Sequence, residues 1–187
     1  MPGDAMEDAL RLAEAFVFAA AGPVTARQLA QVLAEGIEPE TVVAALRARY
    51  AGRGVELVDV AGGVQFRTAE DLSPRLRKVV QVPRKLPRAA METLAIVAYH
   101  QPVTRAEIEE IRGAALSQAT LDALLDAGLI APKGRKEVPG RPTLWATTPA
   151  FLLQFGLRDL RDLPKREDLL VEPLAPAQAP AEPAAEA

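Results

Sequence analysis

Apolar residues recur at helical spacing along parts of the chain, and elsewhere they alternate with polar residues. In residues 39–50, Val42, Val43 and Leu46 share one helical face, and Pro39 suits the first position of a helix. Residues 55–60 and 64–68 alternate instead, on either side of Ala-Gly-Gly, which is typical of a β-hairpin. This part of the chain therefore predicts a helical unit that ends in a small two-stranded sheet.

The same order of elements is predicted a second time. Residues 117–127 place Leu121, Leu124 and Leu125 on one helical face, and Gly128 ends that helix. Two short apolar segments, residues 129–130 and 143–148, then flank a loop in which Pro139-Gly140 favours a type II turn. A short helix over residues 149–155 is predicted to follow.

A short internal repeat supports this duplication. Pro-Val-Thr occurs at residues 23–25 and again at 102–104, an offset of 79 residues, and each copy follows an apolar helical segment. In each copy the threonine can cap a new helix, with Gln28 or Glu107 three positions later completing a capping box. The repeat predicts that the two halves are built to one plan.

Three helices followed by a two-stranded wing make a winged helix. We therefore predict a mainly α protein with small β wings (an α+β fold) that contains two tandem winged-helix domains and a disordered C-terminal tail. The predicted boundaries are a first lobe (residues 1–80), a linker (81–87), a second lobe (88–164) and a tail rich in Pro, Ala and Glu (165–187).

Composition and charge exclude several classes of function. The chain has 187 residues with no Cys and one His, so we expect no thiolate nucleophile, no metal site and no cofactor. No set of residues offers a nucleophile, a base and an oxyanion donor together, so we predict that the protein is not an enzyme. The sequence lacks a predicted signal peptide or membrane span, so we expect a cytoplasmic protein.

Charge also argues against a sequence-specific DNA reader. Residues 1–86 and 87–170 each carry 11 basic and 11 acidic residues, so each half is neutral. The second-lobe recognition helix has no Lys or Arg and carries Asp122 and Asp126, the wrong charge for the major groove. A dimeric winged-helix transcription regulator remains the alternative. Weak, non-specific DNA contact is possible at a basic cluster around the linker, formed by Arg75, Arg77, Lys78, Arg84 and Lys85.

Two helices have more apolar residues than one lobe needs. In residues 88–99, Met91, Leu94, Ala95 and Ala98 are predicted to face the core, so that Ile96, Val97 and Tyr99 are left for another surface. The N-terminal helix is also apolar beyond one stripe. We predict a homodimer formed through the first lobe, with its interface at Leu12, Phe16 and Phe18.

Several spaced motifs resemble those of the segregation and condensation protein B family. They are residues 89–113 (AAMETLAIVAYHQPVTRAEIEEIRG), residues 134–142 (GRKEVPGRP) and the shorter segments at 144–148, 151–152, 155–157 and 162–164. The likeness is close over residues 87–164 and extends to the first lobe in pattern only. Trp145 stands where the family pattern leads us to expect Tyr.

The resemblance implies a non-catalytic subunit of a bacterial condensin-like complex that acts in chromosome condensation and segregation during cell division. Such proteins form homodimers through their N-terminal winged helices. Their second lobes bind the kleisin subunit, segregation and condensation protein A, which links them to the Smc ATPase. The implied location is cytoplasmic and nucleoid-associated. Our expected kleisin contacts are Ile96, Val97 and Tyr99 as apolar anchors, with Arg135, Lys136 and Arg141 at the rim.

Overall fold

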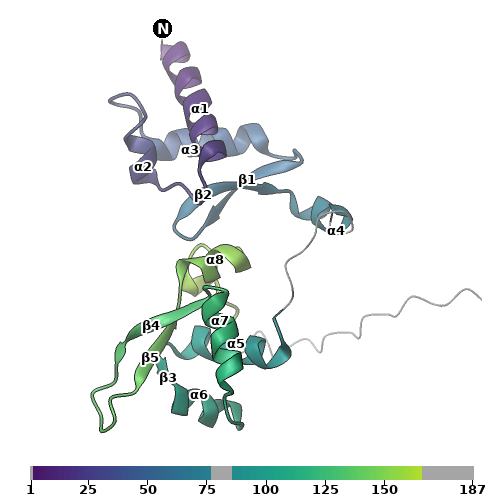
Figure 1. Cartoon of the computed structure of the whole chain (residues 1–187). Helices are drawn as coiled ribbons and strands as arrows, with labels where there is room; N and C mark the ends of the chain where they lie inside the picture. Colours follow the sequence, from purple (N-terminus) through teal and green to yellow (C-terminus); the bar gives the residue numbers. More distant parts are fainter. Residues whose placement is uncertain (1, 77–85, 166–187) are drawn as a thin grey trace, which may run out of the picture.

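The first half of the chain folds into three helices and a hairpin in the computed structural model, which describes residues 2–76 and 86–165 (Figure 1). A 3₁₀ turn at Glu70–Leu72 and a one-turn helix, α4 (Ser73–Leu76), follow the hairpin. The main elements are α1 (Pro2–Ala19), α2 (Ala26–Ala30), α3 (Pro39–Tyr50), β1 (Val55–Val60) and β2 (Gly63–Thr68).

The second half repeats this order and adds a helix. A further 3₁₀ turn, Leu160–Asp162, follows the last helix. The elements are α5 (Arg88–His100), β3 (Val103–Thr104), α6 (Arg105–Arg112), α7 (Gln118–Asp126), β4 (Ile130–Arg135), β5 (Thr143–Thr147) and α8 (Pro149–Phe155). Helices with two small antiparallel sheets, β1-β2 and β3-β5-β4, confirm the predicted α+β class.

Both copies of Pro-Val-Thr have the same structural role. Val24 forms an isolated bridge to Val64 of β2, and Val103 pairs with Trp145 of β5, so each valine holds the start of a helix against the hairpin. Thr25 and Thr104 then cap α2 and α6 through the predicted capping boxes. In each half, the repeated Pro-Val-Thr segment thus connects the start of a helix to the second strand of the hairpin.

The other elements lie close to their predicted positions. The α3 helix has the predicted bounds, and Ser117 caps α7 by accepting a hydrogen bond from the Thr120 N–H at 3.1 Å. At the tip of the second hairpin, Gly140 has φ 84° and the Arg141 N–H donates to the Val138 carbonyl at 2.9 Å, as a type II turn requires. The β4 strand begins at Ile130, one residue after the predicted start, and continues to Arg135, beyond the predicted segment at 129–130.

Each half has its own hydrophobic core. The first core lies between α1, α2, α3 and the β1–β2 hairpin, and the second lies between α5, α6, α7, α8 and the other hairpin. The first core is formed by Ala9, Leu10, Ala13, Val17, Val24, Leu29, Val42, Leu46, Leu57 and Val64. The second is formed by Ala90, Leu94, Val97, Ala98, Val103, Ile108, Leu116, Leu121, Leu124, Leu129, Ile130 and Phe151.

The tip of the first hairpin contacts the second half next to α8 (Figure 1). The Ala61 and Gly62 N–H groups donate to the carbonyl oxygens of Leu157 at 2.8 Å and Arg158 at 3.0 Å. Beside them, the Arg67 guanidinium donates to the Leu153 carbonyl in α8. Backbone groups that normally face solvent at a hairpin tip are therefore paired here with the other half of the chain.

Candidate functional site

An apolar groove lies between the outer face of α5 and α8, with a volume of about 120 Å³. Met91, Tyr99 and Phe155 are its most exposed large side chains, at 41%, 38% and 42% of their surface. Exposed apolar side chains that gather in a concave surface are typical of protein-binding sites. The groove is lined by Met91, Leu94, Ala95, Ala98, Tyr99, Phe151, Phe155 and Leu163.

Helix geometry places three of these residues in one row. Met91, Ala95 and Tyr99 are four positions apart, and residues with this spacing share a helical face. The Tyr99 hydroxyl donates to the Pro164 carbonyl at 2.7 Å, so it holds the segment after α8 along one end of the groove. This hydrogen bond also orients the ring at the mouth of the groove.

The α8 wall of the groove is fixed by its caps. Thr148 accepts from the Phe151 N–H at 3.3 Å and donates through its hydroxyl to the Gly128 carbonyl at 2.6 Å. Gly156 ends the helix with φ 71°, a left-handed conformation that glycine adopts without strain. With both ends held, the Phe155 ring packs against Phe151 at a centroid distance of 4.8 Å.

The inner and outer faces predicted for α5 were partly wrong. Val97 is fully buried, so it cannot be an exposed anchor, and Ile96 is half-buried against the second core. Met91 and Ala95, which we expected in the core, are exposed. Of the three predicted apolar anchors, only Tyr99 lines the groove.

Thr93 explains the error. It takes an inward position that an apolar residue was expected to fill, and it is fully buried. Its hydroxyl donates to the Ala89 carbonyl at 2.8 Å within the same helix, so the polar group is satisfied without leaving the core. The helix is consequently rotated relative to the prediction, and the row from Met91 to Tyr99 faces outward.

The predicted basic rim lies on the second hairpin and is partly neutralised. The Lys136 ammonium contacts Glu107 of α6 at 2.5 Å, and Arg141 contacts Glu137 at 3.2 Å. Arg135 has no ion pair among the residues that the structure describes. The hairpin tip points away from α8 in Figure 1, so these cations are not brought together with the apolar groove.

The pKa of Glu107 is strongly lowered by the groups around it. The Lys136 ammonium and then the backbone N–H and hydroxyl of Thr104 stabilise its charged form, which lowers the pKa of Glu107 to about 2. Glu107 therefore links the capping box of α6 to the second hairpin.

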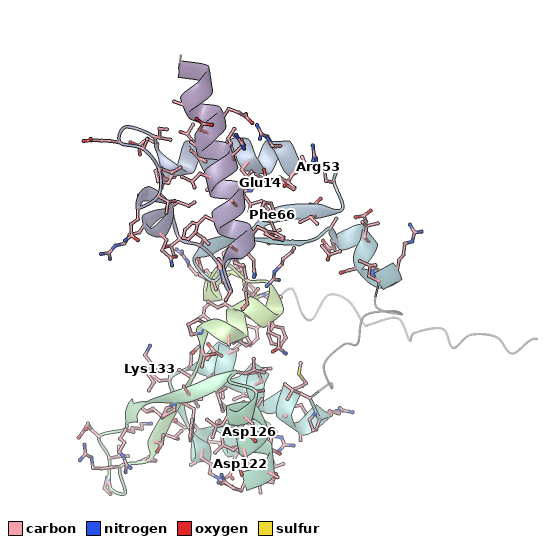
Figure 2. The ribbon with its side chains drawn as sticks, turned by 45° about the horizontal axis from the view of Figure 1, so that its top comes forward. Glu14, Arg53, Phe66, Asp122, Asp126 and Lys133 are labelled. Carbon is pink, nitrogen blue, oxygen red and sulfur yellow. The ribbon has the colours of Figure 1, made fainter. Side chains whose placement is uncertain are left out.

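The helix α7 keeps the acidic surface that the sequence predicted. Asp122 and Asp126 are exposed and lie along α7, as Figure 2 shows, while Lys133 projects from the separate β4–β5 hairpin. An exposed acidic helix repels the phosphates of DNA. Of the predicted linker cluster, Arg75 is exposed at the end of α4. Arg77, Lys78, Arg84 and Lys85 lie outside the described residues.

The three predicted dimer residues lie in different surroundings on α1. Phe18 is 83% exposed and borders a cleft of about 650 Å³ between α1 and the β1–β2 hairpin, where Figure 2 shows Glu14 and Phe66. Leu12 borders a different cleft, of about 400 Å³, beside residues 32–37. Phe16 is half-buried and packs against the first core. The three residues therefore do not form one continuous surface, and Phe18 is the most exposed of them.

Neither a metal centre nor a membrane span occurs in the described parts of the chain. Within residues 2–76 and 86–165, no cluster of three or more His, Cys, Asp or Glu side chains could hold a metal ion. None of the helices there has the length and apolar character needed to cross a bilayer.

A family model described as "Segregation and condensation complex subunit ScpB" matches residues 11–166, which include the groove and, apart from Ala9 and Leu10, both cores. The chain belongs to this family. Members of the segregation and condensation protein B family take their name from chromosome segregation and condensation, and the model describes them as subunits of a complex.

Individual relatives agree over nearly the whole chain. Segregation and condensation protein B of Moorella thermoacetica is 45% identical over 170 residues, which is 87% of this chain and 85% of that protein. The Bacillus subtilis protein of the same name is 44% identical and covers 86% of each chain. A crystal structure of ScpB from Mycobacterium tuberculosis is 32% identical, covers 81% of this chain and 97% of that one, and has a TM-score of 0.38.

In this member of the segregation and condensation protein B family, sequence analysis missed most of the groove. Met91 and Ala95 were assigned to the core, and Phe155 and Leu163 were not assigned to any site. The four-residue spacing of Met91, Ala95 and Tyr99 could have indicated their common face. The contribution of α8 could not be inferred this way, because it depends on how the last helix packs.

Proposed function

We propose that the chain is a non-catalytic subunit of the bacterial condensin-like Smc complex. It acts in chromosome condensation and segregation as a homodimer that binds the kleisin, segregation and condensation protein A. Under this proposal the two halves are tandem winged-helix domains, with the boundaries predicted from the sequence. The kleisin connects the protein to the Smc ATPase, to which ATP hydrolysis belongs. The expected cytoplasmic and nucleoid-associated location rests on the same proposal.

The observation that carries this proposal is the open apolar groove between α5 and α8. Its exposed Met91, Tyr99 and Phe155 offer a partner apolar surface, whereas the charged groups of the α7 helix are all acidic. A kleisin segment with an aliphatic or aromatic side chain fits such a groove, because insertion of that side chain removes apolar surface from water on both partners. The family assignment supports the same kind of partner.

The predicted kleisin contacts have graded roles in this proposal. Tyr99 is the main anchor. Ile96 is half-buried on the same helix and does not line the groove, so its role is smaller. Arg135 is available for an acidic group of the kleisin, while Lys136 and Arg141 must first give up contacts with Glu107 and Glu137. Because a flexible segment loses conformational freedom when it binds, affinity is lower than the buried area alone indicates.

Charge placed in the groove tests the kleisin site. We expect Met91→Asp and Tyr99→Asp each to weaken kleisin binding at least tenfold by isothermal titration calorimetry, because a carboxylate is poorly tolerated in an apolar contact. Ile111→Asp is the matched control, since Ile111 is 45% exposed on α6 of the same lobe and does not line the groove. Unchanged kleisin affinity in both groove variants, with circular dichroism like that of the wild type, would refute this binding site.

The homodimer is proposed to form through Phe18 and the cleft beside it. In a symmetric dimer each partner uses the same surface, so Phe18 of one protomer can cover the equivalent cleft of the other. Phe18→Glu should convert the dimer to a monomer at tens of micromolar, as measured by light scattering of the full chain. Leu12→Glu should have a smaller effect, because Leu12 borders the other cleft. A wild-type protein that is monomeric at this concentration would contradict the dimer itself.

A further inference from the structure

The groove between α5 and α8 lies where the described part of the chain ends. Leu163 lines the groove, and the next residue, Pro164, accepts the hydrogen bond from Tyr99. The 22 residues from Arg166 to Ala187 therefore begin at the Tyr99 end of an open apolar surface. Within them, an aliphatic triplet, Leu169-Leu170-Val171, follows Pro164 after only four intervening residues.

We propose that this aliphatic triplet docks in the groove of its own chain and competes there with the protein partner. The competition rests on the proposed function, whereas docking of the triplet does not. Under this proposal the docking contact involves only residues around 169–171.

The distances permit this docking. From Tyr99 back to Met91, eight residues of α5 rise about 12 Å. Five extended residues, from Pro164 to Leu169, span up to about 17 Å. The triplet can thus run antiparallel to α5 and reach the Met91 end of the groove. A groove of about 120 Å³ has room for part of an aliphatic side chain but is much smaller than the usual pocket for a small-molecule ligand.

Charge favours the same direction. At the start of α5, Glu92 contacts both Arg88 and Arg112, at 2.9 Å and 3.4 Å, which leaves one net positive charge in this cluster. A tail that runs antiparallel to α5 brings Glu172, directly after the triplet, toward this positive end. The reverse direction would place Glu172 near the apolar Leu163 end.

Attachment to the same chain makes a weak contact sufficient. A connection of only four residues keeps the triplet near the groove, at an effective concentration in the millimolar range. If the groove is open for between about one half and one tenth of the time, the measured kleisin affinity falls by about 2-fold to 10-fold. A partner can still displace such a tail.

Methionine NMR tests the docking directly. The chain has three methionines; Met91 lines the groove, while Met6 packs against the first core. The test variant is the full chain with Leu169→Asp, Leu170→Asp and Val171→Asp. Its matched control carries Ala179→Asp, Ala181→Asp and Ala184→Asp, which add the same charge farther along the tail. We expect the Met91 ε-methyl signal to shift in the test variant only, with the Met6 signal unchanged.

The outcomes separate the possible occupants. Identical Met91 signals in the wild type, test variant and control would overturn the proposal, whatever the kleisin does. A shift that disappears on dilution would also overturn it, because the triplet would then occupy a second copy. A shift that persists in the monomeric Phe18→Glu background supports docking within one chain, and a 2-fold to 10-fold gain in kleisin affinity for the test variant supports competition. A shift of the Met91 signal without a gain in kleisin affinity would overturn the competition. It would also overturn the proposal that the triplet and the kleisin share one binding site.

Discussion

Replacing Glu107 with Gln separates the charge of this residue from its role as a helix cap. One carboxylate oxygen of Glu107 contacts Lys136 at 2.5 Å, and the other accepts from the Thr104 N–H at 2.8 Å and the Thr104 hydroxyl at 2.7 Å. In the first half, Gln28 holds the equivalent position and accepts the same two hydrogen bonds from Thr25, at 2.9 Å and 2.8 Å. Glu107→Gln should therefore keep the cap and remove only the ion pair.

The structure sets the size and the pH dependence of the effect. Lowering the pKa of Glu107 from 4.5 to about 2 corresponds to about 3 kcal/mol if fully expressed. The side chains of Lys136 and Glu107 are 44% and 36% exposed, and solvent screening reduces this to about 1 kcal/mol. Because the folded-state pKa is lowered, the stabilisation is complete above the unfolded-state pKa of 4.5. It is lost as the pH falls from there through about 2.

Urea unfolding of the wild type and Glu107→Gln can be followed through Trp145, the only tryptophan, which lies on β5 in the second half. We expect the variant to be less stable by about 1 kcal/mol at pH 7 and by less than half of that at pH 3, because Glu107 of the wild type loses part of its charge there. Lys136→Met, alone and combined with Glu107→Gln, gives the double-mutant cycle. A stability difference that stays the same from pH 7 to pH 3 would refute the assignment of this effect to the ion pair.

Two further predictions concern the first hairpin. A Cβ on Gly63 would lie 2.8 Å from the Val24 carbonyl oxygen. Gly63→Ala should therefore disrupt the pairing of Val24 with Val64 and destabilise the protein by about 1–3 kcal/mol in urea unfolding. Gly22→Ala, whose Cβ meets nothing within 4 Å, is the control and should be neutral or slightly stabilising. In hydrogen exchange, the Gly62 amide should be protected more than the Gly140 amide, because Gly62 donates to the Arg158 carbonyl; equal exchange rates would count against the contact between the halves.

Local sequence signals were enough to predict most elements of the fold. Pro39 at the first turn of α3 and threonine at the N-caps of α2 and α6 fix helix starts through interactions within a few residues. The change from helical spacing to alternation marks both hairpins. Such features depend little on tertiary packing, which explains why they were confirmed close to their predicted positions.

The binding face of α5 was harder to predict because polarity is an imperfect guide to burial. Thr93 satisfies its hydroxyl within the helix and can be buried at little cost, so a polar residue occupies the core-facing row. Met91 was then assigned inward on hydrophobicity alone. A groove that needs both α5 and α8 also depends on tertiary packing, which no periodicity within one helix reveals.

The contact between the two halves leaves no mark in the sequence. The Ala61 and Gly62 amides and the Leu157 and Arg158 carbonyls make it, and backbone groups occur in every residue. The neighbouring contact from Arg67 ends on another carbonyl, that of Leu153. Only the folded chain shows which backbone groups meet.

The contact between the halves covers the tip of the first hairpin but not that of the second, although both halves have the same order of elements. A hairpin tip can contact DNA only where its backbone and side chains are exposed. The first tip is hydrogen-bonded to the segment after α8, so it cannot bind DNA in this arrangement of the halves. The second tip points away from α8, but two of its cations, Lys136 and Arg141, are paired with Glu107 and Glu137. The repeated plan therefore supports a protein-binding role better than a DNA-reading one, with the first hairpin joining the halves and α5 and α8 left open to a partner.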